Sequence, residues 1–456
     1  MAEAFRRMFM RVLQRLKRDE RGAVLVYFTV AILPLLTVVG IGVDLGRIFL
    51  VKQRLTNAAD AAAIAVGAKS NLTTEEASAL ADAFIRAHYP ETVKSFNVDN
   101  TALQVNVTVT AEVSTVFLQL LNTQSVQISV HARATRPQGK VEVAMVIDQT
   151  GSMAGQKLTD LKVAANDLID IVVWKNQTAD YYAKVALVPY GASVNVGGHA
   201  ASVRGSIAPG TCLYPGCEYF QFQNPAGQQK VFQVNSCVTE RTGAQAYTDA
   251  APTVALVGPN YTTASNPCPA NGIVPLTNDK SLLKSQIDLL SAAGSTAGHI
   301  GLAWGWYLLA PSWGYLWPAS QPAPYEELGK VDAKGTPLLQ KIIVLMTDGA
   351  FNTAYCQGVI SKDSGAGAGS SSDRINCDAT NGSSFSQTQT MCGNVKATGI
   401  TIFTVGFGIS GDKQVTDMMT NCATDASHAY LAATGAELRL AFQEIATKIS
   451  SLRLTN

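Results

Sequence analysis

The sequence predicts an α/β protein with a doubly wound, mostly parallel sheet, preceded by a transmembrane helix and a small α+β module. Two observations lead to this prediction. Short runs that are apolar on both faces, as in central parallel strands, occur at residues 141–147, 184–190, 341–347 and 400–408. A stretch without any charge, residues 22–43, is about as long as a bilayer span.

The length and charge of the chain narrow its class. A chain of 456 residues suits two folded units with attachments. Its net charge is +1 and only 15% of its residues are charged. A nucleic-acid-binding protein would need a concentrated basic face, so nucleic acid is not expected as a partner.

The N-terminus is predicted to be an uncleaved, single-pass signal anchor. Basic residues cluster before the span, at Arg6, Arg7, Arg11, Arg15, Lys17, Arg18 and Arg21. They place residues 1–21 in the cytoplasm and the bulk of the chain outside the inner membrane. A cleaved signal and a buried core helix are the alternatives, and the length of the apolar run favours the anchor. The basic residues either lie on the inner membrane surface or form a solvated tail.

Residues 44–136 are predicted to form an exported helical stalk and a small α+β module. The alanine-rich helix continues past Asp44 with apolar residues at helical spacing. A second helix is expected to begin near Thr73 and to end near His88, because Pro90 stops it. Residues 102–117 and 125–135 then alternate apolar and polar side chains, which predicts two strands.

Residues 140–456 are predicted to form the α/β domain. The expected helices are Gln156–Val173, Asp279–Leu309, Phe385–Thr398 and Ala436–Leu452. Two long insertions, at about 196–278 and 352–384, are rich in Gly, Pro, Ser, Asn and Cys. Loops of that length are uncommon in compact domains, so these are expected to be functional or stapled by disulfides.

All the cysteines follow the predicted span: Cys212, Cys217, Cys237, Cys268, Cys356, Cys377, Cys392 and Cys422. In an oxidising exterior an even set indicates disulfides. Four fall in the first insertion and four in or after the second, which favours pairing within each group. Zinc binding and buried free thiols are the alternatives, although no CxxC pair occurs.

Oxygen-bearing side chains follow several of the predicted strands. Asp148, Thr150 and Ser152 follow the first, Asp348 follows the run at 341–347, and Thr296 precedes a predicted helix. Ligands bind at the carboxyl ends of the strands in such sheets. Two carboxylates and three hydroxyls suit Mg²⁺ or Mn²⁺. Either aspartate taken alone is more simply explained as a helix or turn cap.

At these five residues the chain resembles a von Willebrand factor A domain with a metal-ion-dependent adhesion site. The family pattern is D-x-S-x-S, a distant Thr and a distant Asp in a T-D-G context, and here Thr150 replaces the first Ser. The resemblance implies that the hydroxyls bind the metal directly and that the aspartates act largely through water. It also implies an open coordination position for a carboxylate of a protein partner, and no enzymatic activity.

Other chemistries fit less well. Gly151 and Gly155 are one residue too close for a phosphate-binding P-loop, and neither a G-x-S-x-G elbow nor an HExxH motif occurs. His299 is expected to be structural, with a contact to the site as the alternative. Trp304 is expected in the core, and residues 313–317, with Trp313 and Trp317, are candidates for an exposed binding patch.

The segment around the span resembles the N-terminus of TadE/TadG-type proteins of the bacterial tight-adherence (Tad/Flp) pilus machinery. An Arg-Gly doublet precedes the span, and the distinctive residues after it are Asp44, Gly46, Arg47, Leu55, Ala58, Ala59, Asp60, Ala61 and Ala62. Tyr27 stands where processed pilin-like relatives carry Glu, which argues against cleavage at Gly22.

TadG-like members place a von Willebrand A domain after this segment. The expected function is therefore metal-dependent protein binding by an envelope protein, in pilus assembly or surface attachment. The alternatives are a structural scaffold with a non-functional metal site and, more weakly, an exported hydrolase.

Overall fold

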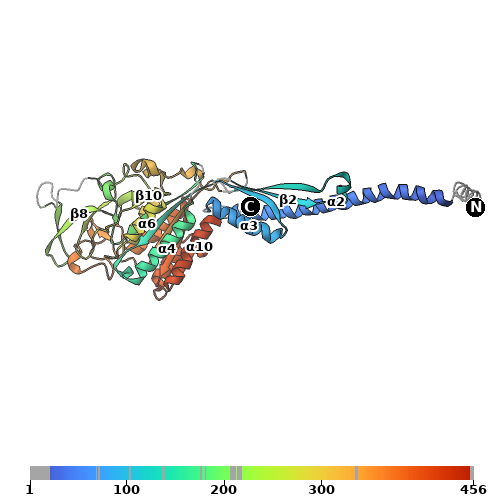
Figure 1. The fold of residues 1–456 in the computed structure, drawn as a ribbon. Helices are drawn as coiled ribbons and strands as arrows, with labels where there is room; N and C mark the ends of the chain where they lie inside the picture. Colours follow the sequence, from blue (N-terminus) through green and yellow to red (C-terminus); the bar gives the residue numbers. More distant parts are fainter. Residues whose placement is uncertain are drawn as a thin grey trace, which may run out of the picture. The chain divides into compact units, whose positions relative to one another are not determined.

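The computed structural model describes residues 21–67, 69, 72–101, 104–135, 139–174, 177–179, 181–205, 212, 218–333 and 337–451. The predicted basic segment, apart from Arg21, lies outside these residues. The chain divides into two compact units, Met1–Arg136 and Pro137–Asn456 (Figure 1).

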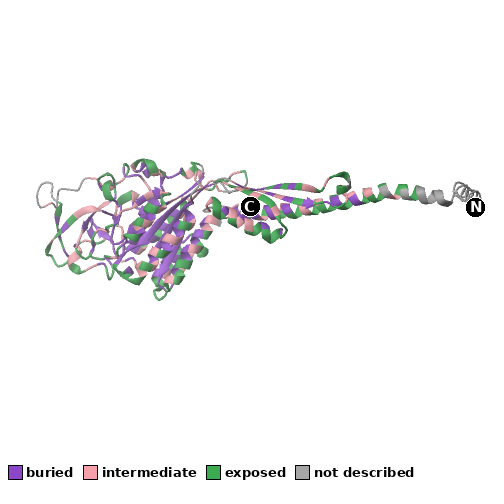
Figure 2. Cartoon of the chain, in the orientation of Figure 1, coloured by how far each residue is buried: buried purple, intermediate pink, exposed green. Residues whose placement is uncertain are grey.

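The first unit is built on one long helix, α2 (Arg21–Gly67), which joins the predicted span and stalk without a break and contains Pro34. Its N-terminal half exposes large apolar side chains, including Leu35 and Leu36, whereas Leu55 and Val66 in its C-terminal half are buried (Figure 2). By length and composition, Val30–Gly67 could cross a membrane. A water-exposed apolar surface of this extent is unfavourable, which fits a lipid environment for the N-terminal half.

A second helix and a three-stranded antiparallel sheet complete the first unit. Helix α3 (Thr74–His88) begins with a capping box between Thr73 and Glu76. The strands β1 (Val93–Asn100), β2 (Gln104–Ser114) and β3 (Ser125–Thr135) follow in chain order across the sheet. Alternate residues of β2 pack on the alanines of α2, which let helix and sheet approach closely. Strand β1 was not predicted, because its sequence, VKSFNVDN, is mostly polar.

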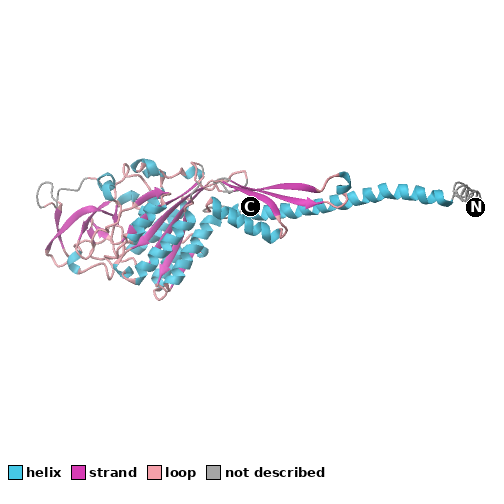
Figure 3. Cartoon of the chain, viewed as in Figure 1, coloured by secondary structure: helices cyan, strands magenta, loops and turns pink. Residues whose placement is uncertain are grey.

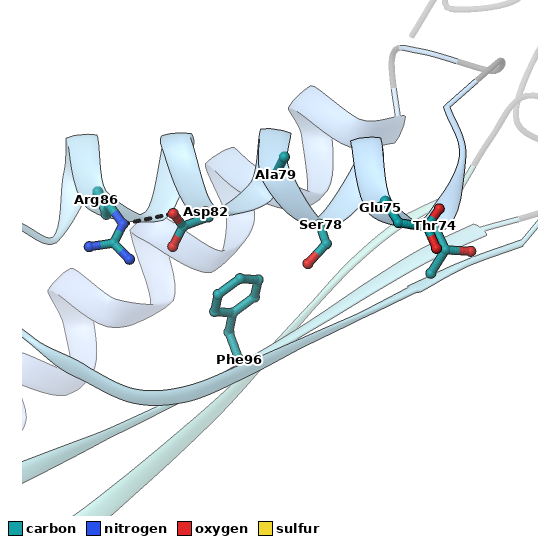
Figure 4. Close-up of a pocket in the computed structure, with 7 residues that line it drawn as sticks. All are labelled: Thr74, Glu75, Ser78, Ala79, Asp82, Arg86 and Phe96. Carbon is teal, nitrogen blue, oxygen red and sulfur yellow. Dashed lines mark hydrogen bonds and ion pairs between the residues drawn. The ribbon is translucent and has the colours of Figure 1, made fainter.

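A shallow pocket of about 620 Å³ lies between α3 and β1 (Figure 4). Phe96 of β1 points toward the polar side chains of α3, among them Ser78 and Asp82. Asp82 pairs with Arg86 one helical turn away, at 2.7 Å. Exposed pairs of this kind contribute only about 0.3–0.5 kcal/mol, so the pocket has no strong polar anchor.

The second unit is built around a mixed sheet, whose strands are magenta in Figure 3, and the pairing at the centre of this sheet is parallel. The parallel strands, in spatial order, are β15 (Ala429–Ala432), β14 (Thr401–Phe407), β11 (Leu339–Thr347), β4 (Lys140–Asp148) and β5 (Tyr182–Tyr190). Beyond β5 the sheet continues with antiparallel strands β6 (Val194–Asn195), β8 (Gln229–Thr239) and β7 (Tyr219–Gln223). Two side branches, β10 (Val274–Thr277) on β5 and β9 (Gly258–Thr262) on β8, are also antiparallel.

Both faces of the central strands are buried. The helices of this unit are α4 (Gln156–Val172), α5 (Ala200–Arg204), α6 (Lys280–Asp288), α7 (Gly298–Leu309), α8 (Ser384–Ala397), α9 (Lys413–Cys422) and α10 (Gly435–Ser451). Helix α7 lies directly on the sheet, where a Cβ on Gly301 would come within 2.7 Å of the Tyr190 ring. Helices α8 and α9 share the core of α7, and α4 packs with α6 and α10.

The elements of the second unit differ from the sequence prediction in several places. The helix expected at 279–309 is two helices, α6 and α7, and the loop between them carries Thr296. The first insertion has its own strands, which extend the sheet beyond β5. Helix α9 and strand β15 were not predicted. The strands of the first insertion and β15 are placed by long-range pairing, which local sequence patterns do not encode. Helix α9 does carry a local signal that was overlooked, the N-cap Asp412.

Disulfides staple both insertions. The bonds are Cys237–Cys268, Cys356–Cys377 and Cys392–Cys422, and Cys212 is also disulfide-bonded. Cys217 lies outside the described residues. Each of the three bonds joins cysteines of the same predicted group, and no described cysteine is free. The second bond joins Cys356, at the end of β12 (Tyr355–Cys356), to Cys377, which follows the short hairpin that β12 forms with β13 (Val359–Ile360).

The predicted aromatic surface patch is wrong for Trp313 and Trp317, which are buried, whereas Tyr315 between them is 49% exposed. The Trp313 ring stacks on Tyr307, with centroids 4.2 Å apart, and its indole N–H donates to the carbonyl of Asp249 at 3.0 Å. The Arg241 guanidinium lies over the same rings. Arg241 and Asp249 come from the first insertion, so this insertion covers what would otherwise be a surface.

A buried ion pair joins β4 to β11. The Lys341 ammonium contacts Glu142, and both side chains are fully buried. Glu142 also accepts from the Tyr182 hydroxyl at 2.8 Å and from the Ala323 backbone N–H at 2.7 Å. Burial lowers the pKa of Lys341, and Glu142 opposes this effect. The buried Glu142 carboxylate therefore depends on Lys341, Tyr182 and the Ala323 backbone for its ion pair and hydrogen bonds.

Replacing Lys341 by Met should destabilise the second unit by about 3–5 kcal/mol, because Glu142 would remain buried without its cation. All five tryptophans lie in this unit, so their fluorescence during urea unfolding reports on it alone. The control is Lys413→Met, which breaks an exposed pair with Asp417 and should cost at most about 1 kcal/mol. Equal effects of the two variants would contradict the prediction.

Candidate metal centre

Asp148 ends β4 and is fully buried. One carboxylate oxygen accepts from the backbone N–H and the hydroxyl of Thr150, at 2.8 and 2.6 Å. The other accepts from the Thr347 hydroxyl of β11 at 2.8 Å and, more weakly, from the Tyr190 hydroxyl of β5 at 3.3 Å. This carboxylate therefore ties together the carboxyl ends of three neighbouring strands.

A chain of hydroxyls connects Asp148 to Asp348. The Thr150 and Ser152 hydroxyl oxygens lie 3.0 Å apart, and Ser152 donates to Asp348 at 2.6 Å. The other oxygen of Asp348 accepts from the Lys157 ammonium, also at 2.6 Å. Asp148, Thr150 and Asp348 are buried, whereas Ser152 is exposed. The cluster thus opens to solvent at Ser152.

The loop before α7 brings Thr296 to the same edge of the sheet. The backbone N–H of Gly151 donates to the carbonyl of Gly294 at 2.9 Å, which joins this loop to the turn after β4. The Thr296 backbone N–H donates to the Asn352 side chain at 3.0 Å, and the Thr296 carbonyl accepts from the Asn352 backbone. The Thr296 hydroxyl makes no hydrogen bond within the described part of the chain, so its lone pairs are available.

Electrostatics at this site disfavour two bare carboxylates. Burial, together with the nearby negative charge of Asp348, raises the pKa of Asp148 to about 6. The hydrogen bonds from Thr150 and Thr347 act in the opposite direction. A cation placed among these oxygens would lower the free energy of the charged form.

The donor set has the chemistry of a hard-cation site. Its members are carboxylate and hydroxyl oxygens, which suit Mg²⁺ or Mn²⁺ with retained water. Among the described residues, no group of three or more His, Cys, Asp or Glu side chains could hold a metal ion. The set therefore depends on Thr150 and Ser152 as much as on its two aspartates. The residues present fit a divalent cation in their chemistry.

The structure gives His299 a structural role. One ring nitrogen lies 2.6 Å from the Ser384 hydroxyl of α8, and the other lies 3.4 Å from Glu240 of the first insertion. This order of groups is that of a serine hydrolase, but His299 is fully buried and Ser384 is only 3% exposed. The three side chains connect α7, α8 and the insertion, and within the described part of the chain none of them is hydrogen-bonded to Asp148 or Thr296.

Sequence reasoning missed two residues that shape the site. The first is Lys157 on the first turn of α4, whose ammonium donates to the Asp348 carboxylate. The second is Asn352 in the second insertion, whose side chain accepts from the backbone N–H of Thr296. Neither belongs to the sequence pattern that identified the other five. Asn352 also lines a pocket of about 340 Å³ with Phe351, Asp363 and Phe385. The second insertion thus contributes both to the site and to the surface beside it.

The N-terminal segment of the first unit is similar to a known protein family. Residues 22–69 match a family model described as Tad, putative Flp pilus-assembly TadE/G-like. This match confirms the resemblance predicted for the N-terminal segment. Together with the apolar helix α2, it fits a membrane-anchored envelope protein. No curated protein matches the chain.

Solved structures with similar folds include two bacterial pilus proteins. The von Willebrand factor domain of the type V pili tip protein Mfa5 from Porphyromonas gingivalis is 13% identical, with a TM-score of 0.38, over 69% of this chain and 96% of that one. The pilus adhesin SpaC from Lactobacillus rhamnosus GG is 12% identical, with a TM-score of 0.37, over 79% of this chain. The alignment spans only 34% of the length of SpaC.

A third similar structure is proximal thread matrix protein 1 from the mussel byssus, solved with a zinc-occupied MIDAS motif. It is 14% identical, with a TM-score of 0.31, over 69% of this chain and 46% of that one.

The stability of the metal-free protein should depend on the protonation of Asp148. Because its pKa is raised to about 6, the folded state binds this proton more tightly than the unfolded chain. The free energy of unfolding in chelator should therefore rise as pH falls from about 6 toward 4, by on the order of 2–3 kcal/mol relative to Asp148→Asn.

Urea unfolding at a series of pH values measures this difference. Asp417→Asn, which alters an exposed carboxylate of α9, should follow the wild-type profile. A constant offset between wild type and Asp148→Asn at every pH would show that the pKa of Asp148 is not raised.

Proposed function

We propose that the second unit is an exported binding domain that captures a protein partner through a divalent cation, and that α2 anchors it in the bacterial inner membrane. The observation that carries the proposal is the continuous cluster from Asp148 through Thr150 and Ser152 to Asp348. The proposed assignment is a metal-ion-dependent adhesion site in a binding protein, and not an enzyme.

Each residue has a distinct proposed task. The hydroxyls of Thr150, Ser152 and Thr296 would hold the cation directly, since a hydroxyl oxygen keeps a lone pair while it donates its proton to a carboxylate. Asp148 and Asp348 would act largely through water and supply the negative charge. The cation would stabilise charge and offer one coordination position to a carboxylate of the partner.

Lys157 is part of the proposed mechanism. Its ammonium pairs with Asp348, which is otherwise a buried carboxylate close to Asp148. A divalent cation at the hydroxyls would repel this ammonium. Lys157 is 38% exposed, so it has room to move toward solvent when the cation binds.

The pilus context is proposed from the N-terminal unit. The match of residues 22–69 to a Flp pilus-assembly family supports a role in assembling, anchoring or attaching such a pilus. The basic residues before the span support a cytoplasmic N-terminus, and the stapled insertions support an exported second unit. A scaffold in which the metal site is inactive is the competing proposal, and metal titration separates the two.

The full chain in detergent should bind Mn²⁺ saturably, and Asp148→Ala should weaken that binding by roughly 10–100-fold, as expected for a residue that acts through water. Thr296→Val, which keeps the shape of the side chain and removes the hydroxyl, should also weaken it. Electron paramagnetic resonance of free Mn²⁺ measures the affinity. Asp417→Ala is the matched control, because this aspartate is exposed and paired with Lys413. A scaffold with an inactive site would show no saturable binding in any variant.

Partner capture should require both Mg²⁺ and a hydroxyl at position 150. Thr150→Ser restores the usual residue of the pattern and should leave capture unchanged, whereas Thr150→Val should abolish it. Crosslinking in envelope preparations with Mg²⁺ or chelator, followed by pulldown of the chain, measures capture. Capture that survives chelator and Thr150→Val would exclude the proposed metal mechanism.

A further inference from the structure

An apolar turn lies between β2 and β3 of the first unit. It consists of Val116, Phe117 and the short 3-10 helix η1 (Leu118–Leu121). The side chains of Val116 and Leu121 are 58% and 59% exposed. No Asp, Glu, Lys or Arg occurs between Glu112 and Arg133. Exposed apolar side chains without a single nearby charge in sequence are unusual for a water-facing loop.

This turn is attached to α2 at the end of the predicted span. The Asp44 carboxylate accepts from the backbone N–H groups of Val116 at 3.1 Å, Phe117 at 2.7 Å and Leu118 at 2.8 Å. One helical turn earlier, a Cβ on Gly40 would lie 2.3 Å from the Phe117 ring. The glycine therefore allows Phe117 to pack directly on the helix.

Asp44 is the first charged residue after the uncharged stretch of α2. N-terminal to it, exposed apolar side chains occur at Tyr27, Phe28, Val30, Leu35, Leu36, Val38, Val39 and Val43. C-terminal to it, Leu45, Phe49 and Leu50 are still exposed, but exposed charged residues begin with Arg47 and Lys52, and the helix then packs on the sheet. The apolar turn is thus held at the end of the stretch of the helix that carries no charge.

Several backbone N–H groups of the turn are hydrogen-bonded within the protein and do not need water as a partner. Unpaired N–H groups are costly in lipid, and Asp44 satisfies three of them. The N–H groups of Asn122 and Thr123 donate to the carbonyls of Gln119 and Leu118, at 2.9 and 3.1 Å. The turn can therefore lose its water without losing hydrogen bonds at these positions.

We propose that the turn Val116–Leu121 inserts into the bilayer surface beside α2 and forms a second membrane contact of the first unit. The inference rests on the proposed membrane anchor, because it requires α2 to enter the lipid just before Asp44. Its occupant is lipid, since the turn continues the apolar surface of the helix and presents no charge to a protein partner. Two contacts fix the tilt of the module on the membrane, which one helix alone does not do.

A thiol probe at Leu121 tests the proposal. Leu121→Cys in the full chain is labelled with an environment-sensitive fluorophore and reconstituted into phosphatidylethanolamine and phosphatidylglycerol vesicles with brominated acyl chains. Leu121 is exposed, so the change leaves the hydrogen bonds of Asp44 intact. The described native cysteines are disulfide-bonded, and labelled wild type gives the background. We expect a blue-shifted emission that the brominated lipid quenches.

Two further labelled variants separate the possible outcomes. Ser129→Cys, exposed in the middle of β3, should be neither shifted nor quenched. Leu36→Cys, in the predicted span, should be quenched. Quenching at Leu36 without quenching at Leu121 would overturn the second contact and leave the anchor standing. A blue shift at Leu121 without quenching would mean that protein, such as a second copy, covers the turn, and this also overturns the proposal. No quenching at Leu36 would overturn the anchor and the second contact together.

Discussion

The second unit depends on one buried carboxylate. Asp148 accepts hydrogen bonds from the turn that follows it, from Thr347 of β11 and from Tyr190 of β5. A buried carboxylate is stable only while such partners are in place, so it holds the carboxyl ends of three adjacent strands in a fixed relation. The segments that carry Ser152 and Asp348 begin at those strand ends. The hydrogen bonds that Asp148 accepts therefore determine the geometry of the candidate site.

This arrangement leaves a local electrostatic conflict. Asp348 lies close enough to raise the pKa of Asp148, and one of its own oxygens is held by a lysine that is partly exposed to solvent. A domain selected for stability alone would gain from replacing one of these aspartates by a neutral residue. Retained conflicts of this kind occur at functional sites, where a ligand removes them. The proposed cation would relieve this conflict, and the Thr296 hydroxyl, which makes no hydrogen bond within the described part of the chain, could serve as one of its ligands.

The sequence predicted the parts of this molecule that local pattern encodes. Runs apolar on both faces located the four central strands, and the spacing of Asp148, Thr150 and Ser152 placed them in one turn. Thr296 was correctly expected just before a helix, but the break between α6 and α7 was missed, because the bonds that hold this loop come from Gly151 and Asn352, far away in sequence. Trp313 was mistaken for surface for the same reason, since Asp249 and Arg241 cover it. Such pairings have no local signature.

The two units use a buried aspartate for different purposes, and the donors explain the difference. Asp44 accepts from three backbone N–H groups, which can donate but can never become ligands. It can therefore only fasten the turn of residues 116–121 to the helix. Asp148 accepts from hydroxyls as well, and a hydroxyl can rotate and turn its lone pairs toward a cation while it still donates. The donors of Asp44 thus leave it a purely structural role, whereas the hydroxyl donors of Asp148 are compatible with the proposed cation.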